Sequence, residues 1–514
     1  GDIIMLSHVE KNYSPGAVVI NDLQQTVSSQ QVLFCCHRLI HHLLEAGVKS
    51  VGLCATNSID WILVDLACQH EDILILPIPT FFTPKQISHA LMSCQLDAVI
   101  TDDLGCLSSL CDIRYEHLGT LAGTDLELVK FPKNLSDPKP NSLPEQGRKN
   151  AVPDGTGKIT FTSGSTGQPK GVCLHHGQLL QQAEALAQSV NIEAPRHLCL
   201  LPLSTLLENV AGNYGPILSG GEIIVPHPES MGFSGSALLE PEQMLSAISS
   251  VRPDSLILVP QLLLLIVAAI RKGWQCPQSL KFIAVGGGKV SKELIIESQN
   301  LGLPVYEGYG LSECCSVVSL NTPKANSAGS CGLPLSHIEL QFEEGEVLVS
   351  GNSMLGYANE PDSWNPEFIS TGDLGFQDEQ GFLHITGRKK NLLISSLGRN
   401  ISPEWVESEL LSGPVLAEVV VVGDDRPYCS ALVLPRSDQL SDEELQSWVS
   451  LVNAKLPDYA RVNQWHRMSA SLAERGGLLT ENGRPKRENI NSAYAEAIDA
   501  MYAAEFLSPE LVPA

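Results

Sequence analysis

Residues 159–172 read Ile-Thr-Phe-Thr-Ser-Gly-Ser-Thr-Gly-Gln-Pro-Lys-Gly-Val, passing from a short apolar segment into a loop rich in hydroxyls and glycines. Such a loop can turn backbone N–H groups, hydroxyls and an ammonium toward phosphate oxygens, because glycine lets the backbone approach closely. A surface loop can have the same composition, so composition alone leaves both interpretations open. A Walker A loop is excluded, because Lys170 is followed by Gly171 instead of Ser or Thr.

The composition is that of a folded chain with more than one domain. Of its 514 residues, 43% are hydrophobic and 18% are charged. This is enough apolar material for roughly two to four structural units. The formal net charge of −25 argues against a nucleic-acid partner and against electrostatic docking on anionic lipid.

The cysteines and the apolar segments favour a cytoplasmic protein. None of the fourteen cysteines belongs to a Cys-x-x-Cys pair, which favours buried, reduced thiols over a zinc site or a secreted disulfide scaffold. The first residues lack the basic and apolar regions of a signal peptide. The most apolar run, residues 256–270, is shorter than a membrane span, so we predict a buried helix there and no transmembrane segment.

Short apolar runs alternate with helical patterns in the N-terminal part of the chain, which is typical of a parallel sheet covered on both faces. Residues 329–382 alternate instead between short β segments and turns. We therefore predict an α/β fold with a large N-terminal domain, residues 1–388, that contains doubly covered sheets and a β-rich subdomain. A hinge at 389–390 would join it to a small, mobile α+β C-terminal domain, residues 391–514.

The individual elements follow from these patterns and from the turn residues between them. A linker rich in Pro, Asn, Ser and Lys is predicted over 132–155. The predicted strands are 51–55, 73–77, 97–101, 198–203, 256–259, 282–285, 346–351, 381–385, 418–422 and 430–434. The predicted helices are 30–44, 59–68, 83–93, 178–190, 402–411, 441–454 and 488–501.

Three further stretches carry groups suited to a nucleotide. Residues 306–313, Tyr-Glu-Gly-Tyr-Gly-Leu-Ser-Glu, offer an aromatic face for a purine and a carboxylate that can hold Mg²⁺ near phosphates. Residues 370–375 contain Asp373, whose two oxygens can both accept hydrogen bonds. The three glycines at 286–288 follow a strand, which allows a tight strand-to-helix turn or a phosphate against the backbone.

In their residues and in their order along the chain, these stretches resemble the motifs of the adenylate-forming superfamily. This superfamily contains acyl-CoA synthetases, luciferases and the adenylation domains of peptide synthetases. The resemblance covers nearly the whole chain and includes residues 387–391 and 395–404. It implies a binding site for ATP and Mg²⁺. The residues that it assigns to this site are Thr162, Ser163, Gly164, Ser165, Thr166, Gly167, Lys170, Gly286, Gly287, Gly288, Glu307, Gly308, Tyr309, Gly310, Ser312, Glu313, Asp373 and Arg388.

The resemblance also gives individual roles. It implies that Tyr309 packs on the adenine, that Ser312 contacts the α-phosphate and that Glu313 holds Mg²⁺. Asp373 would accept hydrogen bonds from the ribose hydroxyls, and Arg388 would also reach the ribose.

Two features of the C-terminal region are implied in the same way. Lys390 falls at the hinge about which the small domain rotates between two half-reactions. The loop 395–402, which contains Gly398, would turn inward for the thioester step. Leu397 replaces a glycine common in the family, and we expect the change to be tolerated.

The chain departs from the family pattern near its C-terminus. Residues 479–487 resemble the block whose lysine stabilises the transition state of adenylation, but Arg484 occupies that position and Lys486 follows two residues later. Arginine keeps the charge and presents a planar fork instead of a compact ammonium. Either cation can offset developing phosphate charge, so the predicted catalytic residues are Thr162, Glu313, Arg484 and Lys486.

Residues 201–209, Leu-Pro-Leu-Ser-Thr-Leu-Leu-Glu-Asn, resemble the block that contacts the acid. Thr205 stands where an aromatic residue or His often gates the acid, and Glu208 and Asn209 complete the predicted substrate contacts. The sequences of this block and of residues 423–428 resemble those of medium- and long-chain fatty acyl-CoA synthetases.

The resemblance implies that the chain activates a fatty acid with ATP and Mg²⁺ to an acyl-AMP and transfers the acyl group to coenzyme A. Two alternatives stay open. A fatty acyl-AMP ligase would load the phosphopantetheine of a separate acyl-carrier protein. A catalytically weak relative would keep the nucleotide pocket but would have lost adenylation through Arg484.

Overall fold

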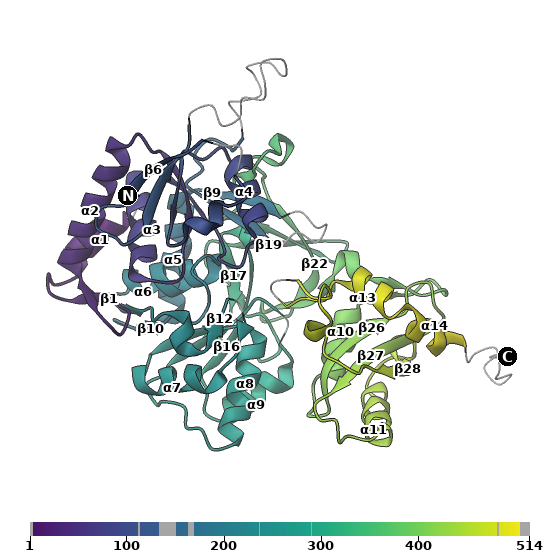
Figure 1. Ribbon diagram of the computed structural model, residues 1–514. Coiled ribbons are helices and arrows are strands. Elements are labelled where there is room, and N and C mark those ends of the chain that lie inside the picture. Colours follow the sequence, from purple (N-terminus) through teal and green to yellow (C-terminus); the bar gives the residue numbers. More distant parts are fainter. Residues whose placement is uncertain are drawn as a thin grey trace, which may run out of the picture.

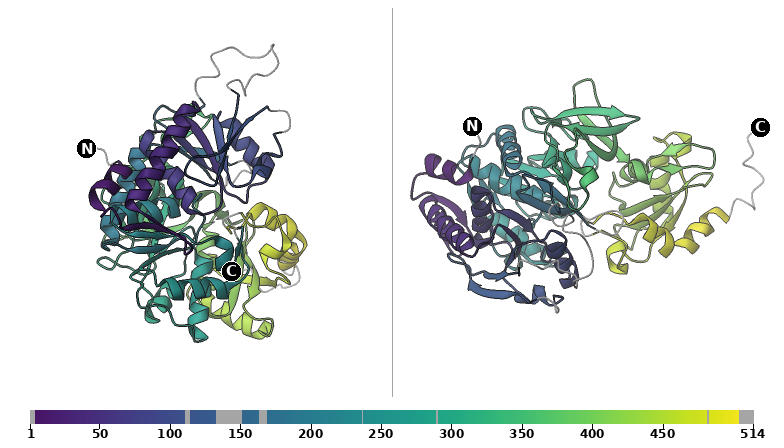
Figure 2. Two further views of the ribbon diagram at one scale, coloured as in Figure 1. Left: turned by 60° about the vertical axis from the view of Figure 1, so that its left-hand side comes forward. Right: turned by 90° about the horizontal axis from the view of Figure 1, so that it is seen from above.

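The computed structural model describes residues 4–110, 114–132, 151–162, 169–235, 237–288, 290–480 and 483–503. It confirms the predicted α/β fold: a large body built on two mixed sheets, a smaller β-rich subdomain, and a compact C-terminal unit beside them. Figure 2 shows the C-terminal unit, in light green to yellow, projecting to one side of the larger body. The predicted domain bounds themselves stay a prediction.

The first sheet carries the strand that leads into residues 163–168. Its central strands β8, β4, β3 and β5 run parallel, and antiparallel strands flank them on both sides. The strands, in sheet order, are β21 (Gly356–Tyr357), β9 (Lys170–Leu174), β8 (Lys158–Thr162), β4 (Leu74–Pro77), β3 (Ser50–Cys54), β5 (Ala98–Thr101), β7 (Glu127–Lys130) and β6 (Glu116–Thr120).

The second sheet carries the triple glycine and the 306–313 motif at the ends of neighbouring strands, β15 and β16, which run parallel. The strands, in sheet order, are β18 (Leu333–Pro334), β17 (Ser316–Leu320), β16 (Val305–Leu311), β15 (Phe282–Val285), β14 (Ser255–Leu258), β10 (Arg196–Leu198), β11 (Glu222–Ile224), β1 (Val18–Asn21) and β2 (Thr26–Ser28).

Helices begin where the sequence supplies a capping side chain. Thr83 accepts a hydrogen bond from the backbone of Gln86, and the Gln86 side chain bonds back, so α4 starts with a capping box and with Pro84 at its first turn. The helices of the large body are α1 (Met5–Asn12), α2 (Ser29–Glu45), α3 (Ile59–Glu71), α4 (Pro84–Ser93), α5 (His176–Val190), α6 (Gly215–Leu218), α7 (Pro241–Val251), α8 (Pro260–Arg271) and α9 (Lys292–Asn300), together with the π-helix η3 (Glu208–Tyr214).

The β-rich subdomain and the C-terminal unit adjoin at the short helix η7 (Lys389–Asn391). The subdomain sheet is β19 (Glu339–Glu343), β20 (Glu346–Ser350), β22 (Ile369–Gln377) and β23 (Leu383–Arg388). The C-terminal unit contains β24 (Leu393–Ile394), β25 (Asn400–Ile401), the sheet β26 (Leu416–Val422), β27 (Cys429–Pro435) and β28 (Val462–Arg467), and the helices α10 (Pro403–Leu410), α11 (Asp442–Asn453), α12 (Leu472–Arg475), α13 (Arg487–Ala493) and α14 (Ala495–Ala503).

Three element predictions need correction. The strand predicted at 198–203 ends at Leu198, four residues before Pro202, whose carbonyl accepts from the Thr205 N–H in a turn. The helix predicted at 488–501 is interrupted at Tyr494, between α13 and α14. Residues 256–270 form strand β14 and then helix α8, because Pro260 suits the first turn of a helix and cannot continue a ladder. Of the predicted linker, residues 133–150 lie outside the described part of the chain.

A buried charge network ties the two sheets of the large body together. The Lys158 ammonium on β8 lies 2.8 Å from Asp65 Oδ1 on α3 and donates to the Tyr214 hydroxyl at 2.9 Å. Lys158 also donates to Asn209 Oδ1, and the Tyr214 hydroxyl and Asn209 both donate to Asp65 Oδ2, at 2.6 and 2.8 Å. Lys158 and Asp65 are each only 1% exposed. Among the described residues, no helix is long and apolar enough to cross a bilayer.

Candidate active site

Three residues from separate strands form the centre of the site. Asp373 on β22 lies 2.7 Å from the Arg388 guanidinium on β23 and accepts a hydrogen bond from the Tyr309 hydroxyl on β16. Burial and the Asp373 carboxylate raise the pKa of Tyr309 well above its usual value. Burial lowers the pKa of Arg388, but Asp373, Tyr309 and Glu313 together outweigh burial, so the pKa is raised. Each Asp373 oxygen keeps a further lone pair, so the carboxylate can also accept from a ligand hydroxyl.

Glu313, in the short helix η5 (Ser312–Cys314), faces this centre. Burial raises the pKa of Glu313, Asp373 raises it further, and Arg388 and Lys170 oppose the rise. A carboxylate oxygen is the kind of ligand that Mg²⁺ prefers, so Glu313 fits that ion. Ser312 and Glu307 occupy the same strand-to-helix segment, with Glu307 buried on β16.

The phosphate-loop residues are only partly described. Thr162 ends β8 and donates to the Lys170 carbonyl at 3.4 Å, which closes the loop at its base. Ser163, Gly164, Ser165, Thr166 and Gly167 lie outside the described residues. The Lys170 ammonium lies 3.5 Å from Glu360 and 4.7 Å above the centre of the Tyr357 ring.

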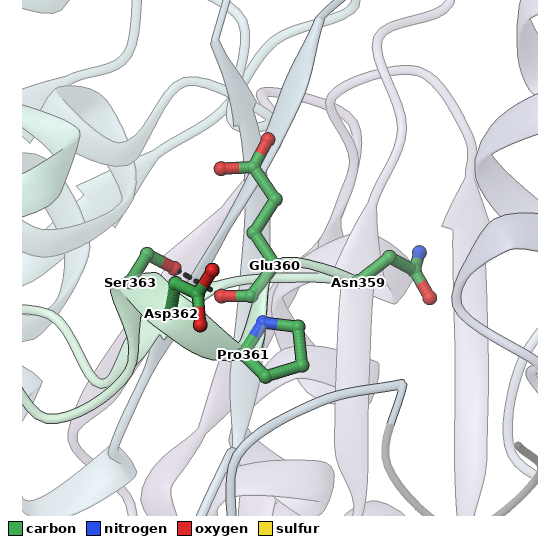
Figure 3. Close-up of a pocket in the computed structure, with 5 residues that line it drawn as sticks. All are labelled: Asn359, Glu360, Pro361, Asp362 and Ser363. Atoms are coloured by element: carbon green, nitrogen blue, oxygen red, sulfur yellow. Dashed lines mark hydrogen bonds between the residues drawn. The ribbon is translucent and has the colours of Figure 1, made fainter.

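A pocket of about 590 Å³ lies beside Lys170, lined among the described residues by 359–363 (Figure 3). In Figure 3 the Glu360 carboxylate extends away from Pro361, and its backbone carbonyl accepts a hydrogen bond from Ser363. Sequence reasoning missed Glu360, Tyr357 and Glu346. Glu346 accepts from the Gly372 N–H at 2.9 Å and pairs with Lys389 at 3.3 Å. No local motif marks these residues, because their partners are distant in sequence.

The glycines that were predicted to approach the nucleotide line the carboxyl ends of β15 and β16. Gly287 has a φ of +80°, a conformation that favours glycine. The nearest side chain to a Cβ on Gly286 would be Leu207, at 3.7 Å, and to a Cβ on Gly288 it would be Pro260, at 3.4 Å. A Cβ on Gly308 would lie 3.0 Å from the Ser319 carbonyl and from the Leu320 side chain.

Gly310 is the glycine most constrained by its neighbours. A Cβ there would run into the backbone carbonyl of Ser316 on β17, next to the irregular register between Tyr309 and Gly310. We expect Gly310→Ala to lower the free energy of unfolding by about 1–3 kcal/mol, because the strands must separate locally. Urea unfolding would measure the loss. Gly16→Ala, whose Cβ meets nothing within 4 Å, is the control; equal losses in both variants would contradict the prediction.

The predicted acid contacts need correction. Glu208 and Asn209 are 0% and 1% exposed, and Asn209 is engaged in the Lys158–Asp65 network. Glu208 lies 3.1 Å from the His197 ring. Both side chains therefore belong to the buried interior and not to a substrate surface. Thr205 is half-buried, and its hydroxyl donates to the Pro202 carbonyl at 2.6 Å. Leu207, which sequence reasoning did not select, is the side chain that faces Gly286.

The C-terminal unit contributes Arg484 to the site. The Arg484 guanidinium donates to the Gly287 carbonyl at 3.4 Å, across nearly 200 residues of sequence. Burial, Arg388 and Arg484 lower the pKa of Lys390, so these three cations gather where the two units meet. The Lys486 side chain is exposed and makes no hydrogen bond or ion pair with any described residue. Gly398 lies in a turn with φ of +79°, next to Leu397, whose side chain is 81% exposed.

Two family models match most of the chain, and known proteins are similar to it over much of its length. The family described as AMP-binding enzyme matches residues 8–357, and the AMP-binding enzyme C-terminal domain matches residues 390–506. The 2-succinylbenzoate–CoA ligase of Bacillus velezensis is 31% identical over 59% of this chain and 64% of its own length. The match thus spans just under two thirds of that relative. The enzyme of the same name from Bacillus cereus is 26% identical over 81% of this chain and 84% of its own length.

Solved structures confirm the fold. The anthranilate CoA ligase in complex with anthranoyl-AMP has a TM-score of 0.77 at 18% identity, over 96% of this chain and 98% of its own. The o-succinylbenzoate CoA synthetase of Bacillus subtilis, in complex with its acyl-adenylate, has a TM-score of 0.74 at 21% identity, over 95% and 98%. Since the first family model alone spans more than half of the sequence, this chain belongs to the AMP-binding enzyme family of adenylate-forming proteins.

Proposed function

We propose that this chain is an AMP-forming acid–thiol ligase: it joins a carboxylic acid to ATP as an acyl-AMP and then transfers the acyl group to coenzyme A. The observation that carries the proposal is the gathering of Asp373, Tyr309, Arg388 and Glu313 from four segments, with Arg484 brought over Gly287 from the C-terminal unit. The Asp373 carboxylate can accept hydrogen bonds from a ribose, Tyr309 offers an aromatic ring, and Arg388, Glu313 and Arg484 supply charges.

Each residue has a chemical task in this proposal. Asp373 accepts from the ribose hydroxyls while Arg388 holds its orientation. Tyr309 packs on the purine and is fixed by its hydrogen bond to Asp373. Glu313 would hold Mg²⁺, which neutralises triphosphate charge when bound. Lys170 and Arg484 bring fixed positive charge to the phosphates, so that the acid's carboxylate can approach the α-phosphorus in line and displace pyrophosphate.

The C-terminal unit would serve the second step. We propose that the arrangement seen in the structure, in which Arg484 of the C-terminal unit contacts Gly287 of the large body, serves adenylation. Rotation at Lys390 would withdraw Arg484 and bring in the exposed turn at Gly398, where the thiol would attack the acyl carbonyl and release AMP. The hinge and the thioester loop rest on the family resemblance.

For the acid we propose a hydrophobic carboxylate, because Leu207 and Val259 are the side chains next to Gly286 and Gly287. Two classes have support. The wording of residues 201–209 favours a medium- or long-chain fatty acid. The relatives named above act, by name, on 2-succinylbenzoate and anthranilate, which favours an aromatic carboxylate.

Pyrophosphate release tests the proposal. Purified protein would be incubated with Mg-ATP and a panel of fatty and aromatic acids, with and without coenzyme A. We expect turnover that depends on both coenzyme A and one acid class. Acyl-AMP that accumulates until a carrier protein is added would favour an acyl-AMP ligase. ATP binding without pyrophosphate release for any acid would overturn the proposal and favour a nucleotide-binding protein without ligase activity.

A further inference from the structure

A second cluster of ligand-type side chains lies in the interior of the large body, apart from the nucleotide contacts. It consists of His197 on β10, Cys199 just after β10, and Glu208 at the start of η3. All three are buried, and a ring nitrogen, the thiol sulfur and a carboxylate oxygen lie within 4.8 Å of one another. Nitrogen, sulfur and oxygen donors of these types are the ligands of zinc in proteins.

The His197 ring is held so that one nitrogen faces the other two ligands. Its Nδ1 lies 2.8 Å from the Ser255 hydroxyl on β14, and its Nε2 lies 3.1 Å from Glu208 Oε1. When Nδ1–H donates to Ser255, the Nε2 lone pair faces the carboxylate, and a bound cation would then join the two acceptors; in the other tautomer Nε2–H donates to Glu208. Histidines that bind metals are oriented by a second hydrogen bond of this kind.

Glu208 is fully buried and has few polar partners. Its side chain is 0% exposed, and its Oε2 has no hydrogen-bond partner among the described residues. Across the same residues, no lysine or arginine forms an ion pair with Glu208; its one ion-pair partner there is His197. An ionised carboxylate in such a place is unfavourable unless a cation compensates it.

Gly212 on the π-helix η3 packs directly against two of these side chains. A Cβ on Gly212 would lie 2.7 Å from His197 Nε2 and 3.1 Å from Glu208 Oε2, so only a residue without a side chain fits here. One residue on, Asn213 Oδ1 lies 3.5 Å from Cys199 Sγ and adds a fourth possible donor. Such π-helical turns often occur at functional sites. The π-helix η3 contacts β10, and α6, which continues η3, contacts the neighbouring strand β11 (Figure 1).

We propose that His197, Cys199 and Glu208 form a buried divalent-metal site of the structural zinc class, with the Asn213 side-chain oxygen as fourth ligand. Leu207, next to Glu208, faces Gly286 in the proposed active site, where a glycine Cβ would lie 3.7 Å from Leu207 Cδ2. The ion would therefore fix the backbone position of Leu207, the side chain that lies next to Gly286 in the proposed active site. The metal site stands on its own residues and not on the proposed ligase activity.

Metal content is the direct test. The zinc content of protein expressed in zinc-supplemented medium would be measured by inductively coupled plasma mass spectrometry. We expect about one zinc ion per folded chain. The Cys199→Ser variant is expected to hold at least tenfold less. Cys36→Ser is the matched control, because Cys36 is equally buried, in α2, its thiol lies 3.5 Å from the Leu63 carbonyl, and it belongs to no group of three ligand-type side chains among the described residues; this variant should keep its zinc.

Cobalt and a second variant keep the test decisive if Cys199→Ser fails to fold. Protein grown with Co²⁺ in place of Zn²⁺ should show a thiolate-to-cobalt absorption band and the visible bands of a tetrahedral ion. Gly212→Ala keeps every ligand but places a methyl group against His197 and Glu208, and should lower metal content at least tenfold. Wild-type protein with below about 0.1 metal ion per chain, or a cobalt spectrum without a thiolate band, would overturn the proposal. Neither readout depends on acid, ATP or coenzyme A.

Discussion

Replacing Arg484 with alanine is expected to slow acyl-AMP formation about 10²- to 10³-fold, the loss typical of removing one fixed donor to developing charge. Arg484 is the C-terminal cation that reaches the site, since its guanidinium donates to the Gly287 carbonyl. Lys486, the other candidate from the sequence, has no such contact, and Lys486→Ala is expected to change the rate less than about threefold. Pyrophosphate exchange with the cognate acid would measure both rates.

Two controls separate catalysis from folding. Arg484→Lys keeps a cation and restores the residue type that the family resemblance implies, so it should retain activity within about tenfold of the wild type. Thioester formation from pre-formed acyl-AMP should be nearly unchanged in Arg484→Ala, because in the proposed second step the small domain would have turned Arg484 away. A larger loss in Lys486→Ala than in Arg484→Ala would reverse the assignment of the catalytic cation.

Replacing Lys158 with methionine is expected to lower the free energy of unfolding of the large body by about 3–5 kcal/mol, the range found when one partner of a buried ion pair is removed. The substitution leaves Asp65 charged and 1% exposed, with hydrogen bonds from Tyr214 and Asn209 but no cation. Since Lys158 begins the strand that ends at Thr162, nucleotide affinity should fall together with stability. Urea unfolding and ATP binding would measure the two effects.

The double variant Asp65→Asn/Lys158→Met tests whether the loss of stability comes from leaving the Asp65 carboxylate without its cation. It removes both charges and keeps an oxygen that accepts from Tyr214, so it should be more stable than Lys158→Met alone. This comparison stays informative if the single variant does not fold. Lys281→Met, at a pair whose lysine is 61% exposed, should cost less than about 1 kcal/mol. A Lys158→Met loss as small as that of Lys281→Met would contradict the prediction.

The sequence by itself determined the fold class and the position of each nucleotide motif. The strands β3, β4 and β5 and the helices between them were predicted because each is coded locally by apolar runs, caps and turn residues. The motif residues Tyr309 and Asp373 were predicted by resemblance, and the structure brings them from strands of two different sheets, β16 and β22, into a hydrogen bond.

Only the tertiary structure decided which polar side chains serve the site and which serve the core. Glu208 and Asn209 looked like substrate contacts, but both are buried between β10, α3 and η3 by partners up to 144 residues away. The choice between Arg484 and Lys486 depended on a contact with Gly287 that spans 197 residues. The cysteine spacing argued against zinc, yet Cys199 meets His197 and Glu208 in space. Local patterns encode strands and turns, whereas these pairings arise only when distant segments pack together.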